Sequence, residues 1–341
     1  MCGIAGIIHI DPNQISRQRL KIMTDTLVHR GPDGEGHWIS EDGKTGLGHR
    51  RLCIIDLSEA ASQPMHYMDR YTIIFNGEIY NYVELKNDLV KKGYSFKTHS
   101  DTEVLLALYH AEKEDCLHLL DGMFAFAIYD NKERKVFCAR DRFGEKPFFY
   151  MHKKNEYFLF ASEIKALKAY SSDYSINNKM LYNYLALGYL NNKSDLSETF
   201  YTDIFQLPHS HYLNIDIEKI DLQIKEYWRI NTNHIDYSTT AQKAAEKLNE
   251  LFYTSVNLRL RSDVNVGSSL SGGIDSSSIV CVIDYLLKRN KSEHSFESSA
   301  FKQKTFSARF PGFKNDEGEF MQMVIDKTNV EPHFVYPSDK T

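Results

Sequence analysis

The chain has 341 residues, 42% hydrophobic and 26% charged, so it can bury a sizeable core and is expected to form roughly two domains. Its net charge of -5, with no long block of like charges, argues against nucleic acid or an anionic membrane surface as the main partner. The sequence shows neither a leader with a basic start nor an apolar run of about 18 residues, which predicts a cytoplasmic protein that acts on small molecules.

The first half of the chain has the pattern of sheets faced by helices. Ser100 and Glu103 have the spacing of a capping box at the start of one helix. Other helices are indicated around 20–27 and 82–91 by apolar residues at helical spacing. Strands are predicted at 71–80, 123–130, 135–141, 146–151 and 157–163.

The second half begins with a weak, polar stretch at 166–238, in which we place the domain boundary. A long amphipathic helix follows at about 240–260. After it, strand and helix patterns alternate at 264–270, 275–287, 304–310, 317–327 and 333–337. That alternation predicts a parallel α/β sheet.

The five cysteines are widely spaced and include no Cys-x-x-Cys pair, which fits neither a disulfide framework nor a zinc site. Cys53, Cys138 and Cys281 lie in apolar runs and are predicted to be buried packing residues. Cys2 directly follows Met1. If Met1 is removed, Cys2 carries a thiol and a free α-amine, which together can act as nucleophile and base.

The stretch "SLSGGIDSSS" lies between a predicted strand and a predicted helix, where backbone N–H groups can bind a phosphate. It lacks the Gly-Lys-Ser/Thr ending of a Walker loop, and a plain Gly-Gly turn capped by Asp275 or Ser276 is the simpler alternative. The string resembles the pyrophosphate loop of N-type ATP pyrophosphatases. That resemblance implies ATP and Mg²⁺ as ligands, with no separate metal centre, and a binding set of Leu270, Ser271, Gly272, Gly273, Asp275, Ser276 and Ala308.

Six further strings follow one another in the first half: "HRGPDG", "GHRRLCIIDL", "FNGEIYNY", "HSDTEV", "GMFAFAIYD" and "RDRFGEKPFFY". Together they resemble the glutaminase domain of class II glutamine amidotransferases, and with the SGGIDS loop nearly the whole chain resembles the glutamine-hydrolysing asparagine synthetase family. At "LPHSHYL" the chain departs from the Pro-Gly usual in that family, so no function is assigned to that segment.

The resemblance implies a fold for each part. Residues 2–165 are expected to form an α+β glutaminase domain of the N-terminal-nucleophile type, an αββα sandwich of antiparallel sheets. Residues 166–238 are expected to connect it to a partial α/β ATP pyrophosphatase domain at 239–341. Because the family's domain continues well beyond such a length, a fragment or truncated chain is expected.

The resemblance also implies roles for single residues. Cys2 would attack the carboxamide of glutamine, with its own α-amine as the base. The side-chain amide of Asn76 and the backbone N–H of Gly77 would bind the oxyanion. Glutamine would be held by Arg51, Ile54, Ile55, Glu78 and Asp101.

Simpler interpretations compete with these roles. Asn76-Gly77 is also a favoured type I′ hairpin turn, and Asp101 could merely stabilise a helix start through its charge. Arg30 and Asp33 are expected to be structural and outside the site. Arg50, next to Arg51, is expected to have no role in binding the α-carboxylate and so serves as the control for Arg51.

The inferred reaction hydrolyses glutamine and uses the ammonia to amidate a carboxylate that ATP has activated, which the resemblance implies to be aspartate. Two alternatives stay open: an amidotransferase of the same build acting on another carboxylate, as in polysaccharide biosynthesis, and a non-catalytic remnant. Small-molecule substrates are therefore the expected partners, without nucleic acid or membrane, and a homodimer is left open.

Overall fold

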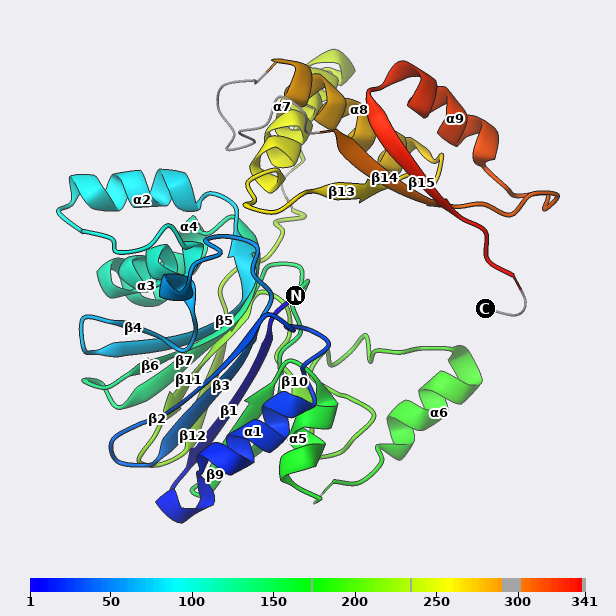
Figure 1. The fold of residues 1–341 in the computed structure, drawn as a ribbon. Coiled ribbons are helices and arrows are strands. Elements are labelled where there is room, and N and C mark those ends of the chain that lie inside the picture. Colours follow the sequence, from blue (N-terminus) through cyan, green and yellow to red (C-terminus); the bar gives the residue numbers. More distant parts are fainter. Residues whose placement is uncertain (173, 234, 290–301, 339–341) are drawn as a thin grey trace. The chain divides into compact units, whose positions relative to one another are not determined.

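The structure, a computed structural model, describes residues 1–172, 174–233, 235–289 and 302–338. The chain forms two compact units, Met1–Asn231 and Thr232–Thr341, which run from blue to green and from yellow-green to red in Figure 1. Within the described residues, no helix combines the length and the apolar character needed to cross a membrane.

The first unit is built on two six-stranded antiparallel sheets. The strands are β1 (Gly3–His9), β2 (Gly34–Ile39), β3 (Thr45–Arg51), β4 (Met65–Tyr67), β5 (Tyr71–Ile79), β6 (Gly122–Asp130), β7 (Lys135–Arg140), β8 (Phe149–Lys153), β9 (Tyr157–Ala161), β10 (Phe205–Gln206), β11 (His211–Asp216) and β12 (Asp221–Glu226). One sheet has the order β10-β8-β9-β1-β3-β2 and the other has the order β12-β11-β7-β6-β5-β4.

Helices cover the outer faces of the two sheets, as Figure 1 shows. α1 (Arg17–Asp25) and α5 (Ile164–Tyr170) pack against the sheet that contains β1, and α2 (Tyr82–Lys91), α3 (Asp101–Glu112) and α4 (Cys116–Leu119) lie over the other. Between the sheets lies a core in which Ile4, Phe160 and Ile74 are fully buried. The expected αββα sandwich is therefore confirmed.

Three strands of this sandwich, β10, β11 and β12, come from the segment that we expected to be a connection. β11 pairs with β7, with Leu213 opposite Cys138, and β12 pairs with β11. Leu213 and Ile215 are fully buried, so β11 places alternate residues in the core between the sheets. The segment also contains α6 (Asn178–Leu187), and the first unit extends to Asn231 instead of ending near residue 165.

Helix α3 starts where the sequence indicates, although its capping differs from the expected box. The Ser100 hydroxyl accepts a hydrogen bond from the backbone N–H of Thr102. Glu103 accepts hydrogen bonds from the backbone N–H groups of Lys97 and Thr98. The buried carboxylate of Glu103 therefore fixes the loop before the helix, and Asp101 opens the first turn.

The second unit contains a parallel sheet in the order β13-β14-β15, as the alternation of patterns predicts. Its strands are β13 (Gly267–Ser269), β14 (Gln303–Ala308) and β15 (Val330–Val335). The helices are α7 (Ala241–Arg259), α8 (Ile274–Arg289) and α9 (Gly318–Lys327). Leu270, Val280, Met321 and Val330 form a small core between the sheet and α8 and α9.

The three cysteines that we predicted to be buried differ from one another. Cys138 is buried, as expected, whereas Cys53 is only partly buried. Cys281 is exposed, so the prediction is wrong for this residue. α8 is amphipathic and turns Val280 and Ile283 inward, which leaves Cys281 on its outer face despite the apolar run around it.

Candidate active site

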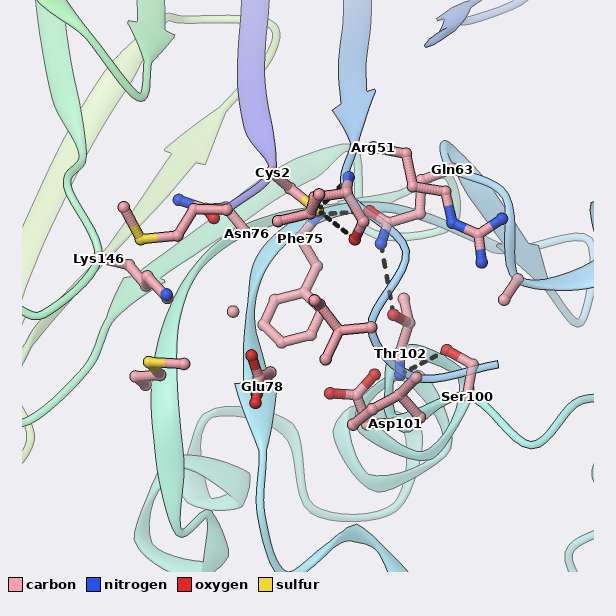
Figure 2. Close-up of a pocket in the computed structure, with 17 residues that line it drawn as sticks. Cys2, Arg51, Gln63, Phe75, Asn76, Glu78, Ser100, Asp101, Thr102 and Lys146 are labelled. Atoms are coloured by element: carbon pink, nitrogen blue, oxygen red, sulfur yellow. Dashed lines mark hydrogen bonds between the residues drawn. The ribbon is translucent and has the colours of Figure 1, made fainter. Parts of the chain in front are cut away.

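A cavity of about 280 Å³ in the first unit brings together residues that are far apart in the sequence. Cys2 directly precedes β1, Arg51 ends β3, and Asp101 opens α3. Figure 2 shows these side chains around the cavity. Its lining includes all eight residues that the sequence predicts for glutamine: Cys2, Arg51, Ile54, Ile55, Asn76, Gly77, Glu78 and Asp101.

The thiol of Cys2 is held at one end of β1. The backbone N–H of Leu52 donates to Sγ at 3.3 Å, and Sγ lies 3.6 Å from the Leu52 carbonyl oxygen. Nε of Arg30 donates to the Cys2 carbonyl oxygen at 3.0 Å, so Arg30 fixes the backbone of this residue. Burial raises the pKa of the Cys2 thiol, and the hydrogen bond from Leu52 only partly opposes this effect. The resting thiol is therefore neutral and needs a base.

Asn76 and Gly77 lie in the middle of β5 and do not form a hairpin turn. They pair with Ala125 and Phe124 of β6. Asn76 is completely buried, and both polar atoms of its side-chain amide lack a hydrogen-bond partner among the described residues. A Cβ atom at Gly77 would lie 2.2 Å from the Met123 carbonyl oxygen, so only glycine fits there. The strand therefore presents to the cavity an amide without a hydrogen-bond partner in the described part of the chain.

Two carboxylates, Glu78 and Asp101, line the same cavity. Burial raises the pKa of Glu78, and the positive charge of Lys146 opposes the shift. Burial also raises the pKa of Asp101 to about 7, although its Oδ2 accepts a hydrogen bond from the Ile79 N–H at 3.0 Å. Glu78 adds to that rise through repulsion. A cationic group placed between the two carboxylates would relieve both effects.

Arg51 faces the cavity from the end of β3, but part of its guanidinium is already bonded. Nη1 donates to the Ser58 carbonyl oxygen at 2.9 Å, and Nη2 donates to the Asp56 carbonyl oxygen at 2.5 Å. A weaker contact joins Nη1 to the Ser62 hydroxyl at 3.5 Å. These contacts use three of the five N–H donors of the side chain and leave the others for a ligand. The neighbouring Arg50 forms ion pairs with Asp25 and Glu35 instead.

Sequence reasoning missed Lys146, which also lines the cavity. The residue is only 3% exposed, and its Nζ forms no hydrogen bond or ion pair with another described residue. Burial lowers the pKa of Lys146, while attraction to Glu78 opposes that shift. Figure 2 shows the side chain on the wall shared by Asn76 and Glu78. Lys146 belongs to the string "RDRFGEKPFFY", so the motif contained this residue, but the sequence alone assigned no role to it.

The two residues that we placed outside the site have clear structural contacts. Arg30 pairs with Glu163 at 3.0 Å, and Asp33 accepts a hydrogen bond from the Cys53 N–H at 2.9 Å. Burial opposes ionisation of Glu163, but hydrogen bonds from Lys165, Arg30 and His29 lower its pKa to about 2. Arg30 thus links Cys2 to a stable anion behind the site.

In the second unit, the SGGIDS loop joins β13 to α8 beside a cavity of about 350 Å³. Leu270, Ser271 and Ala308 line this cavity, together with Phe306 and Glu317, which sequence reasoning missed. The remaining predicted residues, Gly272, Gly273, Asp275 and Ser276, lie on the loop and the first turn of α8 and do not line it.

The loop holds an unusual backbone conformation. Gly272 has a φ of +92°, and a Cβ atom there would lie 2.9 Å from the Glu317 carbonyl oxygen. The hydroxyls of Ser271 and Ser276 are 3.0 Å apart, and the Ser276 hydroxyl accepts from the Ser271 N–H. Two N–H groups of the loop, those of Ser271 and Gly273, thus donate to serine hydroxyls within the loop itself.

Comparisons with known proteins agree with this division into two units. The family described as glutamine amidotransferase domain matches residues 1–228, and the family described as asparagine synthase matches residues 247–340. Glutamine-hydrolysing asparagine synthetase 1 of Bacillus subtilis (strain 168) is 40% identical, covering 83% of this chain and 44% of its own length. A relative from Methanocaldococcus jannaschii is 37% identical, covering 98% of this chain and 65% of its own length. The chain thus spans between about half and two thirds of these relatives.

A solved structure shows the same fold at low sequence identity. Glutamine phosphoribosylpyrophosphate amidotransferase from B. subtilis, in complex with ADP and GMP, aligns with a TM-score of 0.50 and 17% identity. The alignment covers 98% of this chain and 81% of the other. At that identity the likeness concerns the fold alone. Because the first family matches 228 of the 341 residues, the chain belongs to the glutamine amidotransferase domain family.

Proposed function

We propose that this protein is a glutamine-dependent amidotransferase that hydrolyses glutamine at Cys2. The observation that carries the proposal is the cavity that Cys2 shares with Arg51, the acid pair Glu78 and Asp101, and the Asn76 amide, which has no partner among the described residues. These groups match the three parts of a glutamine molecule: its carboxamide, its α-ammonium and its α-carboxylate.

The first step is attack of Sγ on the side-chain carbonyl carbon of glutamine. Removal of Met1 would give Cys2 a free α-amine, which accepts the thiol proton as the S–C bond forms. The negative charge moves to the carbonyl oxygen, where Asn76 Nδ2 and the Gly77 N–H donate hydrogen bonds. Met1 itself lines the cavity, so its removal also clears space beside Cys2.

The second step returns the proton from the α-amine to the nitrogen of the substrate. The C–N bond then breaks, ammonia leaves, and a thioester of glutamate remains on Cys2. Water adds to the thioester, its proton passes through the same amine to Sγ, and glutamate is released. One amine thus serves as base and then as acid, and no histidine is required.

We propose ATP as the second substrate, bound at the SGGIDS loop of the second unit. A loop with glycine at φ +92°, directly before the N-terminus of α8, suits a phosphate group. Mg²⁺ prefers oxygen ligands and is usually held by one or two carboxylates together with substrate phosphates. The carboxylate of Asp275 and the hydroxyls of Ser271 and Ser276 fit that donor set and would hold the ion, which neutralises phosphate charge.

We propose aspartate as the acceptor, because the curated relatives include glutamine-hydrolysing asparagine synthetases. ATP would adenylate its side-chain carboxylate with release of pyrophosphate. Ammonia would then displace AMP and yield asparagine. The second candidate is an enzyme of the same build that amidates another carboxylate. The acceptor assay described below distinguishes the two.

Glutaminase activity is tested with the 341-residue chain by measuring glutamate and ammonia from glutamine. Cys2→Ala is expected to abolish both products. Cys53→Ala, Cys138→Ala and Cys281→Ala serve as matched controls, because these cysteines do not line the cavity. Ammonia release that survives in Cys2→Ala would refute the proposal.

The acceptor is tested by adding ATP, Mg²⁺ and a panel of carboxylates, with pyrophosphate and the amide product as readouts. Asparagine and pyrophosphate formed in equal amounts would support aspartate. An amide formed from another carboxylate, with none from aspartate, would contradict it.

A further inference from the structure

Asp56 links the two ends of the cavity that are proposed to hold the charged groups of glutamine. It follows Arg51 by five residues, has a φ of +53° and is only 8% exposed. Its Oδ2 accepts a hydrogen bond from the His99 N–H at 2.9 Å, and its carbonyl oxygen accepts one from Arg51. His99 precedes Asp101 by two residues, so one residue contacts both the Arg51 side chain and the segment that carries Asp101.

The remaining carboxylate oxygen of Asp56 stabilises its own turn. Oδ1 accepts hydrogen bonds from the Ser58 N–H at 3.1 Å and from the Ser58 hydroxyl at 2.6 Å. The carbonyl oxygen of Ser58 in turn accepts from Arg51 at 2.9 Å. Asp56 therefore also orders the second carbonyl group that orients the guanidinium.

Gln63 makes a second link of the same kind, independent of Asp56. Its Oε1 accepts a hydrogen bond from the Phe75 N–H at 2.6 Å, directly before Asn76. Its Nε2 donates to the Thr102 hydroxyl at 3.4 Å, directly after Asp101, as the dashed line in Figure 2 shows. The two links thus hold the α3 entrance on both sides of Asp101.

The charge of Asp56 strengthens its link. Burial opposes ionisation, but the hydrogen bonds from Ser58 and His99 outweigh this effect and hold the pKa of Asp56 below its usual value. The carboxylate is therefore charged at neutral pH, and hydrogen bonds to a charged acceptor are about twice as strong as neutral ones.

The two charged groups of an α-amino acid are attached to one carbon atom, so the sites that bind them must keep a fixed separation. Here Arg51 comes from β3 and Asp101 from α3, which belong to different layers of the fold. We propose that Asp56, assisted by Gln63, is a positioning residue that holds Arg51 and Asp101 at the separation required by the α-carboxylate and α-ammonium of glutamine. This inference rests on the proposed glutaminase function.

Asp56→Asn tests the inference because it keeps the size and the turn while it removes one acceptor. The amide oxygen can still accept from Ser58, which leaves the amide NH₂ against the His99 N–H. Loss of a charged, buried hydrogen bond is expected to raise KM for glutamine roughly 10- to 100-fold. The kcat value should change by less than about threefold, because binding is weakened equally in the ground state and the transition state.

The matched control is Asp195→Asn. Oδ1 of Asp195 accepts from the Ser197 N–H at 2.9 Å and from the Ser197 hydroxyl at 2.7 Å, in the same kind of turn at an exposed site. Its KM should equal that of the unmodified chain. If Asp56→Asn does not fold, Gln63→Leu decides the question on the same readouts.

A second substrate separates positioning from simple destabilisation. The analogue of glutamine that lacks the α-amine cannot use Asp101, so the unmodified chain should strongly prefer glutamine, and Asp56→Asn should prefer it less. A fall in kcat with an unchanged KM and an unchanged preference would overturn the inference. If the unmodified chain does not hydrolyse glutamine, the proposed function fails instead.

Discussion

Asn76→Ala should reduce activity and at the same time leave the protein at least as stable. Loss of a preorganised donor to the oxyanion typically removes about 3 kcal/mol of transition-state stabilisation, so kcat should fall roughly 100- to 1000-fold. KM should change little, because the hydrogen bond forms only as charge develops on the oxygen.

The effect on stability follows from the two buried amide atoms of Asn76, which lack hydrogen-bond partners among the residues described by the structure. Each unsatisfied buried polar atom costs about 1–3 kcal/mol, and alanine removes both while it keeps Cβ. Because the side chain borders a cavity, little packing is lost. A gain of about 1 kcal/mol corresponds to a rise of roughly 2–4 °C in Tm for a domain of this size.

Asn81→Ala is the matched control with the opposite signs. Nδ2 of Asn81 donates to the Leu119 carbonyl oxygen at 2.9 Å, and its Oδ1 accepts from the Asp121 N–H at 2.9 Å. Its loss should lower stability by about 1–3 kcal/mol and leave kcat intact. Steady-state kinetics and thermal unfolding of both variants measure the effects. An Asn76→Ala variant with a lower Tm and a kcat reduced less than tenfold would refute the reasoning.

Three further predictions concern Cys2 and its surroundings. Intact-mass measurement should show that the active protein begins at Cys2, and a fully active chain that retains Met1 would exclude the α-amine as the base. Glutamine binding to Cys2→Ala, measured by calorimetry, should weaken by up to about tenfold per pH unit as the pH falls below about 7, because the buried Asp101 becomes protonated and no longer attracts the α-ammonium. Asp101→Asn should lose this pH dependence. An affinity that rises toward acid pH would contradict the assignment. Lys146→Met should move the acidic limb of kcat/KM to higher pH, because the Lys146 cation lowers the pKa of the Met1 α-amine and should act in the same direction on the α-amine of Cys2 once Met1 is removed. A shift to lower pH would contradict this role.

The fold was largely predictable where apolar residues follow a clear period. The helix predicted at 82–91 and the strand predicted at 71–80 match α2 and β5 to within a residue. β11 was missed because only Leu213 and Ile215 of its six residues are fully buried, too few to stand out in a polar segment. Pairing with β7 stabilises it, and such a long-range contact leaves no local pattern.

The residues that the resemblance assigns to glutamine binding lie around one cavity. The residues that hold them in place could not be predicted from the spacing of motifs in the sequence. Asn76-Gly77 reads equally well as a hairpin turn, and only pairing with β6 decides for a strand. Asp56 and Gln63 act through bonds to backbone N–H groups more than ten residues away. Lys146 has no hydrogen-bond or ion-pair partner among the residues that the structure describes, and its importance follows only from its burial in the fold.

Because Cys2 directly precedes β1, its thiol can be displaced only when this strand is released from its neighbours. β1 lies between β3 and β9, with Gly3 opposite Arg50 and Ala5 opposite Ala161. A fluctuation that releases the first strand must therefore break two hydrogen-bond ladders at once, which makes it part of the cooperative unfolding of the whole sandwich. The amide protons of β1 should consequently exchange with solvent only at the rate of global unfolding, and partial opening of the outer helices should leave the thiol in place.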